Sequence, residues 1–143
     1  MTSNFDLDVA GRTLCQEARG EPLSGQQAVA HVIKNRLASG RWGRSLSSVC
    51  LWRGQFSGWY VPTDPNFAYA CGLQDADPTL AKMRVLMREV LAAKSDPTKG
   101  ATHYVNLSIV ATPIWVTGDK KRGIVPATPC GKIGAHSFFK DVK

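Results

Sequence analysis

The sequence predicts an α+β domain that is mainly helical, with short β segments in its C-terminal third. Three stretches before residue 93 repeat apolar residues every three or four positions, which is the period of an amphipathic helix. After Gly100 this period gives way to short β-prone runs separated by loop residues. A chain of 143 residues is long enough to bury one core, so we expect a single domain over residues 1–143.

The first predicted helix runs from Asp6 to Ala18. Ser3, Asn4 and Asp6 are all suitable residues to cap its start, and Gly20 is well placed to end it in a left-handed conformation. The positions that form its apolar face are Leu7, Ala10, Leu14 and Ala18.

A second helix is expected to begin near Ser24, because Ser24 and Gln27 have the spacing of a capping box. It should end before Gly40. His31 lies off the apolar stripe and is expected to be solvated. The stripe itself consists of Ala28, Val29, Val32, Ile33 and Leu37.

The middle of the chain contains a short helix, a long loop and a third main helix. We expect the short helix at Ser45–Leu51 and an irregular binding loop at Trp52–Asp75, which is rich in Gly, Pro and aromatic residues. Asp77 then caps the third helix, with Pro78 at its first position, and the helix ends by Asp96. Its buried face comprises Leu80, Met83, Leu86, Met87, Val90 and Leu91.

The C-terminal third has three short apolar segments. Ala101–Val105 and Ile114–Val116 are β-prone, and Ile133–Phe139 is the third. Between the second and third, Gly118, Asp119 and Gly123 indicate a turn.

The chain is basic, with a net charge of +7 and a pI near 9.5. Such a surface favours polyanions such as nucleic acid, anionic lipid or acidic envelope polymers. The charges are dispersed apart from Lys120–Arg122, and no nucleic-acid recognition motif is present, so we expect no specific nucleic-acid partner. We also expect no transmembrane segment and no secretory signal, and hence synthesis in a cytoplasm.

The four cysteines, Cys15, Cys50, Cys71 and Cys130, are widely spaced. None forms a Cys-x-x-Cys pair, so neither a zinc site nor a thioredoxin-like centre is expected. Cysteine–histidine catalysis lacks a local signature as well. We therefore predict no metal and no cofactor.

The candidate catalytic residues are two glutamates, which lie on either side of the glycine between the first two predicted helices. Glu17 falls in the last turn of the first helix, where the helix dipole and burial in a cleft both raise the pKa of a carboxyl. Glu21 precedes the next helix, whose free N–H groups favour an ionised carboxylate. A glycosidic bond requires such a proton donor beside an ionised partner. The alternative stays open on these residues alone, because glutamates at surface helix ends commonly do no chemistry.

Aromatic, amide and hydroxyl side chains of the kind that grip sugars occur in the long loop and after Gly100. For Trp115, as for Phe56, a place in the core is an equal alternative, whereas Trp59 and Tyr104 fit a groove better. The predicted substrate-binding residues are Gln55, Ser57, Trp59, Tyr104, Asn106 and Trp115.

These residues carry a resemblance to the SleB-type cell wall hydrolase family, which includes spore-cortex-lytic enzymes and phage lysins. The order and spacing of its motifs are preserved over nearly the whole chain. One departure is Gln16, where the family typically has a glycine before the first glutamate. The matching segments are Gln16–Pro22, Gly25–Ala30, Val32–Arg36, Gln55–Ser57, Gly100–Asn106, Ile114–Trp115 and Ile133–Phe139.

The resemblance implies a compact lysozyme-like or lytic-transglycosylase-like domain that cleaves the β-1,4 bond from N-acetylmuramic acid to N-acetylglucosamine in peptidoglycan. It assigns Glu17 as general acid and then general base. Lytic transglycosylase and muramidase chemistry both remain open, since Glu21 is a possible second carboxylate.

A basic catalytic domain without a signal or wall-binding domain fits a phage or prophage endolysin. The resemblance then implies a monomer that is made in the host cytoplasm, is released with the help of a holin, and acts at the cell wall or periplasm. The alternatives are a non-catalytic peptidoglycan-binding or virion structural module and, more weakly, a DNA-associated basic protein.

Overall fold

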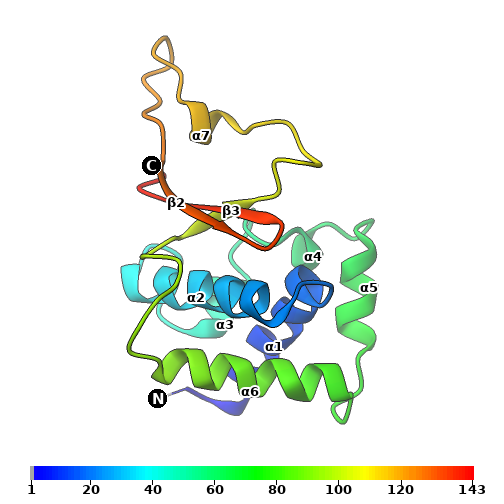
Figure 1. The fold of residues 1–143 in the computed structure, drawn as a ribbon. Helices are drawn as coiled ribbons and strands as arrows, with labels where there is room; N and C mark the ends of the chain where they lie inside the picture. Colours follow the sequence, from blue (N-terminus) through cyan, green and yellow to red (C-terminus); the bar gives the residue numbers. More distant parts are fainter. Residues whose placement is uncertain (1) are drawn as a thin grey trace.

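The computed structural model describes residues 2–143 as a helical body that carries a small sheet on one side (Figure 1). The mainly helical α+β class, with its strands in the last third, is confirmed. The helices are α1 (Asn4–Ala18), α2 (Leu23–Ser39), α3 (Leu46–Cys50), α4 (Ser57–Tyr60), α5 (Pro65–Gly72), α6 (Pro78–Ala92) and α7 (Ile114–Thr117). The strands are β1 (His103–Val105), β2 (Thr128–Ile133) and β3 (His136–Lys140).

Helix α1 begins as predicted but ends differently. The Ser3 hydroxyl accepts a hydrogen bond from the Asp6 N–H at 3.1 Å, and the Ser3 N–H donates to the Asp6 carboxylate at 3.2 Å. The expected left-handed Gly20 is wrong, because the capping residue Arg19 is right-handed and Gly20 has no positive φ. Instead the Arg19 guanidinium donates to the carbonyls of Cys15 and Gln16, at 2.8 and 3.3 Å. A cationic side chain therefore provides hydrogen bonds to the free backbone carbonyls at the end of this helix.

The predicted capping box of α2 is also wrong, since the helix starts at Leu23 and its N-cap, Pro22, makes no side-chain bond. The end is as predicted, with Gly40 left-handed at φ 67°. His31 is not solvated but only 4% exposed, with Nδ1 3.4 Å from an Asp96 carboxylate oxygen. Asp96 belongs to the segment that follows α6. The residues next to His31 in the chain therefore do not indicate this contact.

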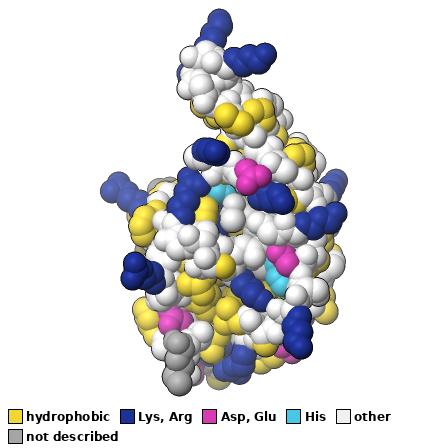
Figure 2. Space-filling view, turned by 90° about the vertical axis from the view of Figure 1, so that its left-hand side faces the viewer, with side chains coloured by type: hydrophobic (Ala, Val, Ile, Leu, Met, Phe, Trp, Pro, Cys, Tyr) yellow, Lys and Arg dark blue, Asp and Glu magenta, His cyan; other side chains and the backbone are white. Residues whose placement is uncertain are grey.

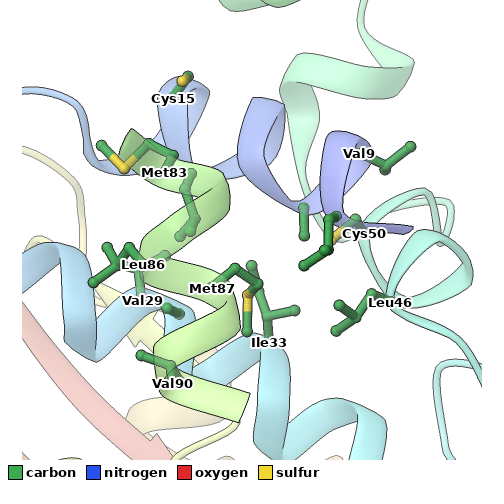
Figure 3. Packing of buried hydrophobic residues seen from close by; sticks show 14 of the residues in the cluster. Val9, Cys15, Val29, Ile33, Leu46, Cys50, Met83, Leu86, Met87 and Val90 are labelled. Atoms are coloured by element: carbon green, nitrogen blue, oxygen red, sulfur yellow. The ribbon is translucent and has the colours of Figure 1, made fainter. Parts of the chain in front are cut away.

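The core lies where α6 packs along α1 and α2 (Figure 3). All the predicted stripe residues of α1 are buried, and those of α2 and α6 are buried except Leu37 and Leu91, which are half-buried. Each large side chain removed from water here stabilises the fold by about 1.5–3 kcal/mol. The largest fully buried side chains of this cluster include Phe56, Leu14, Ile33, Leu46, Leu80, Met83 and Met87.

The segment 52–75 is more ordered than predicted. It contains α4 and α5 rather than an irregular loop. The reason for α5 is local, because the Asp64 carboxylate accepts from the Asn66 N–H at 2.9 Å and Pro65 occupies the first turn. The short helix α3 is confirmed, and Ser45 caps it.

The three strands form an antiparallel sheet in the order β1-β3-β2. Tyr104 pairs with Phe138, so the side chains of Tyr104, His136 and Phe138 share one face of the sheet. On this face Phe138 packs against Ala28 and Val32 of α2. The sheet thereby covers the side of α2 that faces away from α6.

Residues 107–127, which we call the arm, project from the sheet away from the helical body (Figure 1). The expected strand at Ile114–Val116 is wrong, because these residues form the helical turn α7, in which the Val116 N–H bonds back to the Pro113 carbonyl at 2.9 Å. The predicted turn is confirmed by the bridge between Asp119 and Ile124. The exposed cations Lys120–Arg122 occupy this turn, and Figure 2 shows basic side chains at the tip of the arm.

Among residues 2–143, the helices are all too short or too polar to cross a membrane.

Candidate active site

Glu17 lies in the last turn of α1 and is half-buried under the sheet. Its Oε2 atom accepts a hydrogen bond of 2.5 Å from the hydroxyl of Tyr104 on β1. Burial raises the pKa of Glu17 above its usual value, and the hydrogen bond from Tyr104 opposes this rise without cancelling it. This site thus holds a carboxyl that keeps its proton to a higher pH than an ordinary glutamate.

Arg36 of α2 is the buried cation of the site and is only 4% exposed. Its Nε donates to the Thr102 carbonyl at 2.7 Å, and its guanidinium lies over the rings of Trp42 and Phe56. Its charge lowers the pKa of Glu17 and so stabilises the carboxylate once the proton has left. Sequence reasoning missed Arg36. Arg36 follows Val29 and Ile33 at helical spacing, which places it on the buried stripe of α2. This spacing alone predicts a buried arginine.

Asp64 is the carboxylate whose charge acts on Glu17, since it raises the pKa of Glu17. The Ser57 hydroxyl donates to one oxygen of Asp64 at 2.7 Å, and the Asn66 N–H donates to the other at 2.9 Å. These bonds lower the pKa of Asp64, which is therefore ionised at neutral pH. Asp64 was also missed, although Asp64-Pro65 repeats the cap pattern of Asp77-Pro78.

Glu21 occupies a different environment in the loop between α1 and α2. Its Oε1 atom lies 3.0 Å from Nδ1 of His136, and both side chains are 14% exposed. Burial lowers the pKa of His136, so this imidazole is neutral at pH 7. The charged groups that shift the pKa of Glu17 are Arg36 and Asp64, not Glu21.

The other predicted substrate-binding residues mostly have structural partners. The Trp59 indole donates to the Thr13 hydroxyl at 2.8 Å, and Trp115 packs edge-on against Phe139 at 5.3 Å. The Asn106 carboxamide accepts from the N–H of Ser108 at 3.1 Å, and Gln55 is half-buried beside α4. The structure therefore brings Tyr104 to Glu17, and Ser57 to Asp64, while Trp59 and Trp115 pack against neighbouring elements.

Gln16, which stands where the resemblance predicts a glycine, connects α4 to α1. Its amide donates to the Gly58 carbonyl at 3.1 Å. A Cβ atom at Gly58 would lie only 2.6 Å from the Gln16 side chain, so the glutamine fits against a glycine. This contact holds the segment that carries Ser57 and Asp64 next to the helix that carries Glu17.

A family model described as Cell Wall Hydrolase matches residues 20–139, which include Glu21, Tyr104 and His136. The chain belongs to the cell wall hydrolase family. The match begins three residues after Glu17, so the assignment of Glu17 rests on the geometry above and on the sequence motif.

A curated relative agrees with this match. The chain is 32% identical over 116 residues to a spore cortex-lytic enzyme of Halalkalibacterium halodurans, a stretch that is 80% of this chain and 31% of that protein. The chain thus spans about a third of the length of this curated relative.

Two solved structures have the same fold. One is the catalytic domain of the germination-specific lytic transglycosylase SleB from Bacillus anthracis, at 26% identity and a TM-score of 0.69, with 96% of each chain covered. The other is the catalytic domain of the Bacillus cereus SleB protein, at 27% identity and a TM-score of 0.71, with 98% of this chain and 93% of that chain covered. The predicted SleB-type resemblance and fold are confirmed.

Proposed function

We propose that this cell wall hydrolase is a lytic transglycosylase that cleaves the β-1,4 bond from N-acetylmuramic acid to N-acetylglucosamine in peptidoglycan. The observation that carries the proposal is Glu17, a half-buried carboxyl with a raised pKa, held at 2.5 Å by the hydroxyl of Tyr104. The similarity to the catalytic domain of a SleB lytic transglycosylase supports it.

In this mechanism the hydrogen bond from Tyr104 decides which oxygen of Glu17 reacts. Because Oε2 accepts from Tyr104, Oε1 is left to carry the proton. Glu17 gives this proton to the glycosidic oxygen as the bond to the muramoyl C1 breaks, and the N-acetylglucosamine 4-hydroxyl leaves. The muramoyl 6-hydroxyl then attacks C1 and returns its proton to Glu17. A 1,6-anhydro ring forms and the acid is restored.

The occupancy of the other carboxylates favours this route over hydrolysis. A hydrolase of the usual type needs a second carboxylate that is free to attack C1 or to activate a water. Glu21 is packed against His136, and both oxygens of Asp64 are engaged by Ser57 and Asn66. The anhydro-forming reaction needs only Glu17.

Digestion of purified walls, followed by mass analysis of the fragments, tests the proposal. We expect wild type to yield anhydromuramoyl ends. Glu17→Gln should lose at least about 100-fold in rate, because general acid catalysis contributes about 10²–10⁴. Glu89→Gln, which changes an exposed glutamate on α6, is the matched control and should digest walls like wild type.

The products and the variants separate the alternatives. Reducing muramoyl ends together with an inactive Asp64→Asn variant would instead indicate a muramidase that uses Asp64. Full digestion by Glu17→Gln would refute the assignment of Glu17. Wall binding without any cleavage by wild type would identify a non-catalytic peptidoglycan-binding or virion module.

We further propose an endolysin role, in which a monomer made in the cytoplasm of a phage host reaches the wall with the help of a holin. The net charge of +7 supports attraction to an anionic envelope. Expression in a bacterial host with and without a co-expressed holin tests this role. Lysis should require both the holin and Glu17, and equal lysis without the holin would contradict the proposed release route.

A further inference from the structure

We propose that Glu21 and His136 form a positioning pair that holds Tyr104, and through it Glu17, and that Glu21 does not act on the substrate itself. Four side chains carry this inference. They form one continuous series of contacts that runs from the loop between α1 and α2, through β3 and β1, back to the end of α1.

The first link joins the helical body to the sheet. Glu21 precedes α2 and His136 begins β3, and their contact of 3.0 Å spans these two parts of the fold. The Nδ1 atom of His136 lies close to the Glu21 carboxylate without the geometry of a hydrogen bond, so packing and electrostatics carry this link. Two titratable groups lie next to the His136 ring. One is the phenol of Tyr104, and the other is the charged side chain of Glu21.

Glycines enclose the other oxygen of Glu21. A Cβ atom on Gly134 would lie 3.0 Å from Glu21 Oε2, and one on Gly25 would lie 3.3 Å from it. Gly134 also has a φ of 60°, a conformation that favours glycine. The carboxylate thus sits in a close-fitting niche between the β2–β3 turn and α2, where it is not free to attack a sugar.

The second link connects His136 to the proton donor. The His136 ring meets the Tyr104 ring edge-on, with centroids 4.9 Å apart and planes at 74°. Phe138 lies against both rings, at 5.9 Å from Tyr104 and 6.3 Å from His136. The hydroxyl of Tyr104 then donates to Glu17 at 2.5 Å. A shift of His136 therefore moves the ring whose hydroxyl orients the acid.

The test is a pH titration of Glu17 in the full chain, in which ¹³C NMR of labelled glutamate carboxyls reports the pKa. Glu21→Ala and His136→Ala should each raise the pKa of Glu17 by about one unit, because they loosen a hydrogen bond to a charged group. Glu21→Gln should leave the pKa of Glu17 unchanged, since glutamine has nearly the same shape and keeps the close contact with His136. The matched control is His31→Ala, which removes the other buried histidine with an acidic neighbour, Asp96, at 3.4 Å.

Kinetics supply the second readout, and this part rests on the proposed function. His136→Ala should lower kcat about tenfold with little change in KM. The double variant Glu21→Ala/His136→Ala should have the same kcat as the less active of the two single variants, because the two residues act as a unit. Glu21→Gln should retain most activity. Far-UV circular dichroism confirms that each variant is folded.

Two results would overturn the pair. One is an unchanged Glu17 titration in folded His136→Ala. The other is a Glu21→Gln variant as inactive as Glu17→Gln, which would make Glu21 a catalytic group. If Glu17→Gln digests walls normally, the proposed function fails, but the titration still decides whether Glu21 and His136 position Tyr104.

Discussion

Replacing Tyr104 by Phe removes the hydroxyl that donates to Glu17 at 2.5 Å and leaves the aromatic ring in place. This bond lowers the pKa of Glu17, so its loss should raise that pKa further above the usual value. A hydrogen bond to a charged group contributes about 1.5–3 kcal/mol, and one pKa unit corresponds to about 1.4 kcal/mol. We therefore expect a rise of about one to two units.

The assay is the pH dependence of kcat/KM for wall digestion, which reports the groups of the free enzyme. In the proposed mechanism the protonated form of Glu17 is the active one. The fall in kcat/KM at high pH should therefore move to higher pH by the same one to two units. Tyr69→Phe serves as a control, since Tyr69 packs against Arg19 and not against Glu17. An unchanged limb, or one displaced to lower pH, would refute the role assigned to this hydrogen bond.

Three further predictions follow from the fold and the charge distribution. Burial lowers the pKa of His103 from 6.5 to about 4, so stability present above pH 6.5 should be lost as the pH falls, by about 2 kcal/mol at pH 5. Urea titrations should show this loss, and a His103→Gln variant with the same pH dependence as wild type would exclude His103 as its source. Gly58→Ala should destabilise the fold by about 1–3 kcal/mol in thermal unfolding, because its Cβ would lie 2.6 Å from Gln16, and Gln16→Gly in the same chain should restore part of the loss. Reversing the charges of Lys120–Arg122 should weaken binding to purified walls at low salt. At 1 M salt, where the screening length falls to about 3 Å, the variant should bind like wild type. If the variant binds like wild type at low salt as well, the arm does not attract the protein to the wall.

Local patterns predicted the helices well and the strands less well. Ser3, Ser45 and Asp77 mark their helix starts because a capping side chain bonds to N–H groups two or three residues away. Ile114–Val116 has β-prone residues, but a strand needs a partner, and this segment satisfies its N–H groups in the turn α7. Its β character was therefore overridden by the surrounding structure.

The sequence by itself determined the helical stripes, the starts of α1, α3 and α6 and the placing of Glu17 at a helix end, because all of these depend on spacing along a few turns. Only the tertiary structure decided how the two glutamates differ. Tyr104 reaches Glu17 across 87 residues, and Glu21 instead meets His136. Such pairings depend on how the sheet packs over α2, and that packing brings together groups whose separation in the chain hides their proximity.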